Sequence, residues 1–450
     1  MRIDPANAEI PGAIAFRLSG SVVARQRSLR KILIALAICV AGGFVALMAG
    51  PLTSGALLLL LPADGPRLDH DLPDSYRPVH KGHVDIATGL YIREDEDIVV
   101  RGTPPLVLRR TYLSNYHANK QFGIGTTHPG EWYVIGDGER FTWAALILAD
   151  GAQIRFERTS AGHSFLNAMY EHRATPSEWQ GARFGWTGLG WALRQRDGAL
   201  ARFRGCSQGS VCSIVETRDP DGHVIAYRRD SSGRLSRMEA SRDRWIAFDY
   251  DADDRIQRAY SSAGDEVVYG YDARGRLVRA ADRDGTARRY SYTDADLMAT
   301  IEDPGHTIEN EYDSDGRCVR QVNRYPDGRE PYTFTFAYAV DQGAVVAAST
   351  TETGGIWSRF TFGKDRYTTS ESRGSEGIEP TVITYERDAV TNFVTGLTVT
   401  CPDRTGRPLR HDSLVKPGWE DWTKWDLFRT HCSSKRRPER TPGAIVISSR

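Results

Sequence analysis

Polar and apolar residues alternate along the middle of the chain, from residue 224 to residue 318. Two large side chains, mostly aromatic, recur two positions apart, as in the pairs Phe248 and Tyr250, and Tyr269 and Tyr271. Residues i and i+2 of a β-strand point to the same face of a sheet. The alternation therefore predicts a series of short strands whose aromatic residues share one face.

A short sequence recurs at intervals of about 21 residues. The tyrosines at positions 250, 271, 292 and 312 are separated by 21, 21 and 20 residues, and a related segment begins at Asp230. Self-similarity at a fixed period is typical of a repeat architecture. The residues that define the repeat are Tyr250, Asp251, Tyr271, Asp272, Gly275, Arg276, Leu277, Tyr292, Tyr312, Asp313, Gly316 and Arg317.

Two kinds of tight turn alternate with the predicted strands. In the turn from Asp272 to Gly275, we expect the aspartate to accept a local backbone hydrogen bond and the glycine to adopt a positive φ. A second kind of turn lies between the repeats, as at residues 282–285. Each period therefore predicts one β-hairpin. Because a single hairpin is marginal in water, we expect stacked hairpins that pair edge to edge and bury a continuous aromatic face.

The repeat resembles the YD repeat of the RHS family, which includes teneurins and bacterial toxin-cocoon proteins. Residues 83–89 and 105–112 are similar to the segment that precedes the repeats in bacterial RHS proteins, and residues 190–203 are similar to the entry into the first repeat. The resemblance covers roughly residues 79–340. It implies an all-β fold in which stacked antiparallel hairpins form part of a hollow shell around a toxin or other cargo.

The resemblance also implies a structural role without bond chemistry. Closed shells of the family contain many more repeats than the five or six that can be recognised here. The chain also lacks the D-P-x-G-L junction at which many members cut themselves. We therefore expect a shell fragment or scaffold that holds a partner or cargo chain, without self-cleavage.

An apolar run predicts a membrane anchor near the N-terminus. Residues 32–61 are interrupted only by Thr53 and Ser54, and they exceed the roughly 20 residues that cross a bilayer. Four cations lie between residues 25 and 31, whereas mostly acidic residues follow the run. The bias places the long C-terminal body on the periplasmic or extracellular side of the inner membrane. The alternative is a cleaved signal peptide and secretion, although such a peptide has an apolar region of only about 7–15 residues.

The predicted organisation has six parts. They are a cytoplasmic tail (1–31), the transmembrane anchor (32–61), a linker (62–78), an RHS-type N-terminal β domain (79–205), the YD repeats (206–340), and a divergent β region with a Trp-rich end and a basic tail (341–450). In the last part, polar and apolar residues alternate as in β-strands, which fits either worn (degenerate) repeats or a β-rich end cap.

Composition excludes some classes of protein. The 58 Lys and Arg residues balance 58 Asp and Glu residues, so the chain lacks the basic excess of a general nucleic-acid binder. Of the six cysteines, five follow the predicted anchor, where the compartment is oxidising. Cys206 and Cys212 lie close enough in sequence to close a small loop as a disulfide. No spacing among the cysteines matches a zinc site.

Candidate catalytic motifs lack the context that their chemistry needs. Residues 205–209 match G-x-S-x-G, but a strand and a turn follow instead of the helix of a nucleophile elbow. His80, His83 and Asp85 could form a metal corner, yet no third soft ligand is in register. We therefore predict no catalytic residue, cofactor or metal.

The C-terminal part leaves two further functions open. Trp419, Trp422 and Trp425 are spaced by three, which fits either aromatic packing onto the sheet or a platform for a glycan or a partner. A glycan-binding surface adhesin is therefore the alternative function. His411 and His431 raise a third possibility, a degenerate C-terminal toxin.

Overall fold

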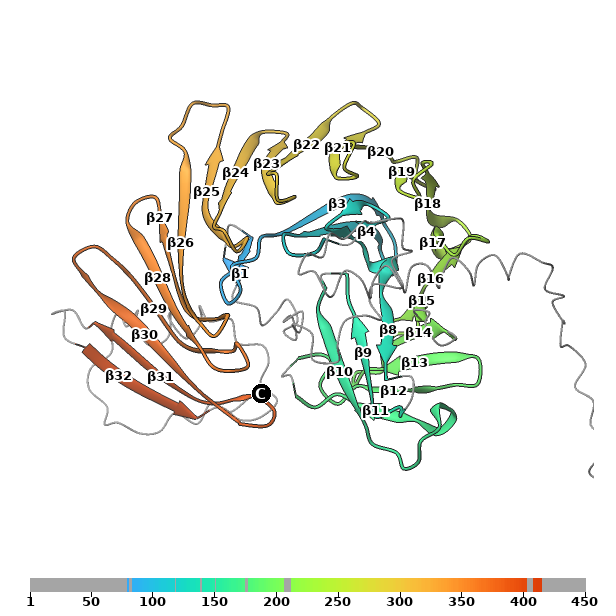
Figure 1. The fold of residues 1–450 in the computed structure, drawn as a ribbon, viewed down its shortest axis with the longest axis horizontal. Coiled ribbons are helices and arrows are strands. Elements are labelled where there is room, and N and C mark those ends of the chain that lie inside the picture. Colours follow the sequence, from blue (N-terminus) through green and yellow to red (C-terminus); the bar gives the residue numbers. More distant parts are fainter. Residues whose placement is uncertain are drawn as a thin grey trace, which may run out of the picture. The chain divides into compact units, whose positions relative to one another are not determined.

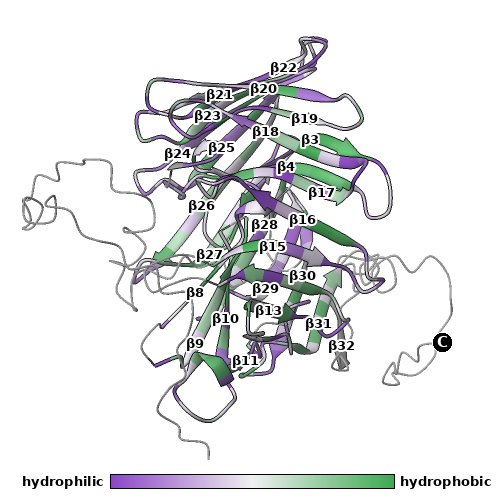
Figure 2. Cartoon of the chain, turned by 90° about the vertical axis from the view of Figure 1, so that its right-hand side faces the viewer, coloured by the Kyte–Doolittle hydropathy of each residue, from purple (hydrophilic) through white to green (hydrophobic). Residues whose placement is uncertain are grey.

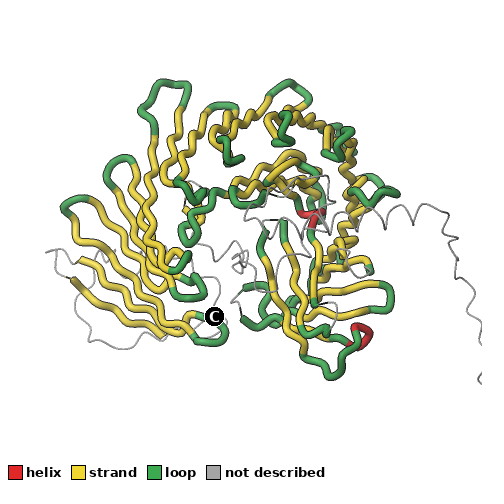
Figure 3. Tube along the Cα trace, in the orientation of Figure 1, coloured by secondary structure: helices red, strands yellow, loops and turns green. Residues whose placement is uncertain are grey.

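The computed structural model describes residues 79–414, except for 81–82, 118, 138–139, 150, 175–176, 206–211 and 403–407. These residues belong to the second of two compact units, Ser54–Arg450. The only helical segments in the described part are two 3₁₀ turns, η1 (Pro129–Glu131) and η2 (Phe165–Asn167) (Figure 3). The prediction of an all-β fold is confirmed.

No helix within the described ranges is long and apolar enough to cross a bilayer. The predicted anchor, residues 32–61, lies outside those ranges and stays a prediction.

Seven strands precede the main sheet. β3 pairs antiparallel with β4, which also pairs with β7, and two separate pairs join β1 to β2 and β5 to β6. The strands are β1 (Val79–His80), β2 (Val84–Asp85), β3 (Ile92–Val100), β4 (Leu106–Leu113), β5 (Asn119–Lys120), β6 (Gly123–Ile124) and β7 (Thr126–Thr127). The hairpin of β3 and β4 lies inside the curve of the later strands (Figure 1).

Strands β8 to β15 form a closed ring of antiparallel strands. Each strand pairs with the next along the chain. The ring closes where Cys212 and Ser213 of β15 pair with Val134 and Tyr133 of β8. The strands are β8 (Tyr133–Gly136), β9 (Trp143–Ile147), β10 (Gln153–Arg158), β11 (Met169–Glu171), β12 (Arg183–Trp186), β13 (Gly190–Arg194), β14 (Leu200–Arg204) and β15 (Cys212–Arg218).

From β15 the sheet continues as one antiparallel ladder, in chain order, to β32. The strands are β16 (Val224–Arg229), β17 (Leu235–Ser241), β18 (Arg244–Tyr250), β19 (Ile256–Ser261), β20 (Glu266–Tyr271), β21 (Leu277–Asp282), β22 (Ala287–Tyr292), β23 (Met298–Asp303), β24 (His306–Tyr312), β25 (Cys318–Arg324), β26 (Tyr332–Asp341), β27 (Ala344–Glu352), β28 (Ile356–Phe362), β29 (Thr368–Ser375), β30 (Ile378–Arg387), β31 (Val394–Pro402) and β32 (Pro408–Leu414). The predicted hairpins form and pair edge to edge, as between β19 and β20.

One hydrophobic core joins the hairpin, the ring and the repeats. The repeat strands carry hydrophobic and hydrophilic residues in alternation (Figure 2). Their inner residues, such as Tyr269 and Ile301, are buried together with Leu106 and Leu108 of β4. The inner face of the repeats is therefore covered by the chain's own upstream hairpin.

Candidate functional site

Each repeat turn is closed by the carboxylate of its aspartate. One oxygen of Asp251 accepts from the backbone N–H groups of Asp253 and Arg255, both at 2.9 Å, and the other accepts from Nε of Arg255 at 2.8 Å. The turns that begin at residues 230, 272 and 313 have the same contacts. Burial opposes ionisation of Asp251, but the hydrogen bonds from Arg255 outweigh it and lower the pKa of this carboxyl. The fourth position adopts positive φ, 85° at Gly275.

The arginine and the tyrosine of the motif connect consecutive repeats. The guanidinium of Arg255 lies over the ring of Tyr271, 4.7 Å from the centroid, and the hydroxyl of Tyr271 donates to the carbonyl of Ile256 at 2.7 Å. Arg234 with Tyr250 and Arg276 with Tyr292 have the same arrangement, at 4.6 and 5.0 Å. The tyrosine hydroxyls donate in the same way to Leu235, Leu277, Met298 and, from Tyr338, Cys318. The motif therefore joins each hairpin to the previous one.

A variant of this connection occurs after residue 341. Here Tyr367 occupies the arginine position and Arg387 occupies the tyrosine position. Arg387 lies 5.0 Å from the centroid of Tyr367, and its Nε donates to the carbonyl of Thr368 at 3.2 Å. This exchange of partners favours the interpretation of residues 341–414 as worn repeats.

An N-terminal segment, residues 83–131, is bound along the inner ends of the repeat turns. Backbone groups of successive repeats face it in a line, which we call the turn row. From Gly275 to Cys318, later repeats meet earlier residues of the segment, so over this stretch the segment runs in the opposite direction to the repeats. The bonds are Ile256 N to Gln121 O (2.6 Å), Ile124 N to Gly275 O (3.2 Å), Met298 N to Tyr112 Oη (2.9 Å) and Cys318 N to Gly89 O (2.8 Å).

The contact is close enough to require glycine at one point. Gly123 has a φ of 83°, and a Cβ there would lie 2.4 Å from the carbonyl oxygen of Gly275. A side chain at this position would push the segment away from the turn row.

Buried charges fix the hairpin of β3 and β4 against the repeats. Three arginines face three aspartates, with two tyrosine hydroxyls between them. We call this group the Arg110 cluster; its members are Arg93, Asp95, Asp97, Arg110, Tyr269, Arg288, Tyr290 and Asp303.

Arg110 is the centre of the cluster. Its guanidinium binds both oxygens of Asp97, at 2.5 and 2.9 Å, and donates to the hydroxyl of Tyr290 at 3.1 Å. Tyr290 donates onward to Asp95 at 3.0 Å, and Tyr269 donates to Asp97 at 2.6 Å. The side chains of Arg110 and Asp97 are 3% and 0% exposed. Each of these two buried charges therefore has an opposite charge and a tyrosine hydroxyl beside it.

Arg93 and Arg288 extend the cluster to β23. Arg93 donates to Asp95 at 2.9 Å and to Asp303 at 2.7 Å, and Arg288 lies 3.3 Å from Asp97. Burial opposes ionisation of Asp95, but Arg110 and Arg93 outweigh it and lower its pKa. Burial raises the pKa of Tyr290, so its hydroxyl stays protonated and can donate. The arrangement holds two segments together.

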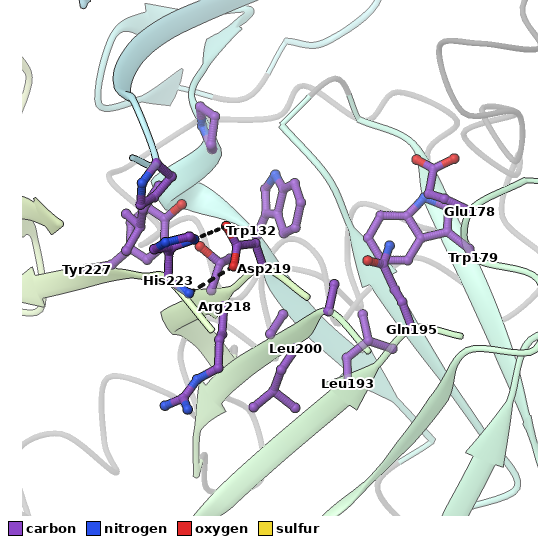
Figure 4. A pocket seen from close by; sticks show the side chains of 16 residues that line it. Trp132, Glu178, Trp179, Leu193, Gln195, Leu200, Arg218, Asp219, His223 and Tyr227 are labelled. Atoms are coloured by element: carbon purple, nitrogen blue, oxygen red, sulfur yellow. Dashed lines mark hydrogen bonds and ion pairs between the residues drawn. The ribbon is translucent and has the colours of Figure 1, made fainter. Parts of the chain in front are cut away.

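A pocket of about 410 Å³ lies where the ring meets η1 (Figure 4). Trp132, Trp179, Leu193 and Tyr227 line it, together with the turn from Asp219 to His223. Asp219, Asp221 and His223 lie close enough together to hold a cation. However, Asp219 closes this turn as in the repeats, because it accepts from N and Nδ1 of His223, both at 2.8 Å. His223 thus stands at the arginine position, and we assign no metal there.

Several residues singled out by the sequence have structural roles or lie outside the described ranges. His83 has a φ of 61° in a turn, and Asp85 accepts from the N–H of Ala87. Cys212 and Cys401 are each disulfide-bonded, whereas Cys318 is free and buried. His411 lies on β32, opposite Val399. Outside the described ranges are Cys206, Ser207, Trp419, Trp422, Trp425 and His431, so the roles predicted for them stay predictions.

Sequence reasoning missed the Arg110 cluster. Its signal was the spacing of Arg93, Asp95 and Asp97, which puts charges two residues apart on a strand with apolar ends. Such a run resembles an ordinary solvated face, and its partners lie about 190 residues further along the chain.

Comparison with known proteins supports the repeat assignment. Residues 250–287 and 271–308 match the RHS Repeat family, and residues 81–156 match a domain of unknown function, DUF6531. No curated protein matches the chain.

Three of the solved structures that match the chain illustrate a weak similarity. The TcdB2–TccC3 toxin structure is 12% identical, with 72% of this chain and 19% of that chain covered and a TM-score of 0.32. The Tc holotoxin pore of Photorhabdus luminescens is 13% identical, with coverage of 73% and 20% and a TM-score of 0.32. A porin-like protein from Bacteroides uniformis is 16% identical, with coverage of 48% and 93% and a TM-score of 0.21.

The chain spans about a fifth of the length of the two Tc toxin chains. TM-scores this low do not establish a shared overall fold, so the assignment depends on the repeats themselves. The matched residues form antiparallel hairpins whose Asp, Arg and Tyr side chains repeat one set of contacts. The chain is an RHS/YD-repeat protein.

Proposed function

We propose that the chain is a non-enzymatic shell fragment that is exported, anchored in the membrane, and holds a partner or cargo chain against the inner wall of its repeats. The turn row carries this proposal. Repeats at residues 256, 275, 298 and 318 bind an upstream segment of the chain, and three of these four bonds join backbone to backbone. Main-chain bonds of this kind give affinity without requiring one particular sequence. A wall built this way is suited to hold another polypeptide.

The wall extends beyond the residues that the N-terminal segment contacts through the turn row. On β28, the rings of Phe360 and Phe362 stack at 6.5 Å and continue the aromatic inner face. Side chains on the outer face of the sheet are more exposed than these; Val268 on β20, for example, is 37% exposed. We propose that the partner or cargo chain binds along β26–β31.

One observation and one prediction from the sequence support the proposed location. Cys212 and Cys401 are disulfide-bonded, which is typical of proteins in oxidising compartments. The predicted span at residues 32–61 would supply the anchor, with the body on the periplasmic or extracellular side.

Site-specific photo-cross-linking tests the proposal. A benzophenone amino acid would replace Phe360 on the inner face or Val268 on the outer face of the full chain, expressed in a bacterial envelope. We expect adducts of discrete mass at position 360 and none at position 268. Equal adducts at both positions, or none at either, would contradict a partner-holding wall. Release of the chain from membranes by alkaline carbonate would contradict the anchor alone.

A further inference from the structure

One end of the ring exposes a cluster of apolar side chains. Leu189 is 93% exposed at the tip of the β12–β13 turn, and Leu166 in η2 is 64% exposed. Met169 and Phe165 are 43% and 37% exposed. The ring of Phe165 meets that of Trp186 edge to face at 5.2 Å, which joins the two loops. We call these five residues the loop patch; exposed apolar side chains gathered on neighbouring loops are typical of an interaction site.

The loop that presents Phe165 and Leu166 is rigidly built. The guanidinium of Arg158 donates to the side-chain oxygen of Asn167 at 3.0 Å and to four backbone carbonyls at 3.0–3.2 Å. These carbonyls belong to Phe141, Ser160, Ala161 and Ser164. These hydrogen bonds fix the loop in a conformation that exposes its apolar side chains.

Backbone groups of the same loop are hydrogen-bonded within the protein, as an apolar environment requires. The hydroxyl of Ser164 accepts from the N–H of Leu166 at 3.2 Å, and that of Ser160 accepts from the N–H of Met169 at 3.0 Å. With the carbonyls bound by Arg158, these backbone groups need no water. Unsatisfied backbone groups are what normally excludes a loop from an apolar medium.

We infer that the loop patch inserts into the interfacial layer of a lipid bilayer. Leucine, phenylalanine, methionine and tryptophan are suited to the boundary between headgroups and acyl chains. Arg140 on the β8–β9 loop and Arg204 at the end of β14 are exposed at the same end of the ring and would meet anionic headgroups.

Chain length also favours the bilayer over other occupants. This inference rests on the proposed anchor, because residues 62–78 would then tether the body within about 60 Å of the membrane. Tethering raises the effective concentration of the second contact. The bilayer would then hold the body at two places, the anchor and the loop patch.

The test uses the full chain in nanodiscs of phosphatidylcholine and phosphatidylglycerol. A benzophenone amino acid would replace Leu189, or Asp197 in the β13–β14 turn of the same ring as a matched control. We expect lipid adducts at position 189 at least fivefold above those at position 197. The double variant Leu166→Ser/Trp186→Ser, with the probe at position 189, should reduce the lipid adducts and leave nanodisc incorporation unchanged.

Each other outcome identifies what fails. A chain that inserts into nanodiscs but forms no lipid adduct at position 189 overturns the loop-patch inference and leaves the anchor intact. Adducts to a second copy of the chain, in place of lipid, overturn it in favour of self-association. A chain that stays out of nanodiscs overturns the anchor, and the inference with it.

Discussion

The substitution Arg110→Met tests whether buried charge fixes the N-terminal hairpin to the repeats. Methionine keeps much of the volume but removes the cation that binds both oxygens of Asp97 at 2.5 and 2.9 Å. Asp97 is then left with a side chain that is 0% exposed, with Arg288 at 3.3 Å and Tyr269 at 2.6 Å as remaining partners. Removing one member of a buried ion pair costs about 3–5 kcal/mol. Because two partners remain, we expect a loss near the lower end, about 3 kcal/mol.

The neighbouring residue supplies a matched control. Arg109 pairs with Glu96 at 2.5 Å, but the two side chains are 45% and 49% exposed. Exposed pairs contribute about 0–1 kcal/mol, so Arg109→Met should change stability by less than about 1 kcal/mol. Urea unfolding of the purified chain, followed by tryptophan fluorescence, gives both free energies of unfolding. Equal losses for Arg109→Met and Arg110→Met would refute the reasoning. The double variant Arg110→Met/Asp97→Asn should recover part of the loss, because the buried side chain that lost Arg110 is then neutral.

Three further predictions use the same urea assay. His128 is buried, and burial lowers its pKa to about 3, so the unfolded chain takes up a proton below about pH 6.5 that the folded chain does not. Wild type should therefore lose about 2 kcal/mol more than His128→Gln between pH 7 and pH 5, and equal losses would contradict this. Tyr271→Phe removes the 2.7 Å hydrogen bond to the carbonyl of Ile256 and should lower the free energy of unfolding by about 1–2 kcal/mol. An unchanged urea midpoint would show that this link between repeats adds nothing to stability. Gly123→Ala should lower the free energy of unfolding more than Gly285→Ala does. Both glycines have positive φ, but a Cβ at Gly285 would meet nothing within 4 Å. The reverse order would count against the close approach of Gly123 to the turn row.

The repeats could be predicted because their information is local. An aspartate that binds the N–H groups two and four residues later needs only the turn itself, as Asp272 does with Arg274 and Arg276. The nearly constant spacing of the repeat tyrosines, as from Tyr250 to Tyr271, likewise indicates which strand each residue occupies. The repeat period, the turn residues and the aromatic face all indicate the same hairpins, and this agreement allows the structure to be predicted from the sequence.

The candidate site could be predicted only in part because its contacts join distant residues. Nothing near Asp97 in the sequence indicates that Tyr269 and Arg288 lie beside it. The closure of the ring, where Cys212 pairs with Val134, is equally non-local. A run of alternating charges on a strand fits a solvated face or a buried network equally well, and only packing decides between them.

Hydrogen exchange at three backbone amides tests the central claim most directly. In the full chain, the N–H groups of Ile256, Met298 and Cys318 belong to the repeats, but their acceptors belong to the N-terminal segment. We predict that all three amides exchange slowly and that Arg110→Met accelerates all three together. Fast exchange at these amides, while ladder amides of β19, β23 and β25 stay protected, would contradict the binding of the N-terminal segment to the turn row.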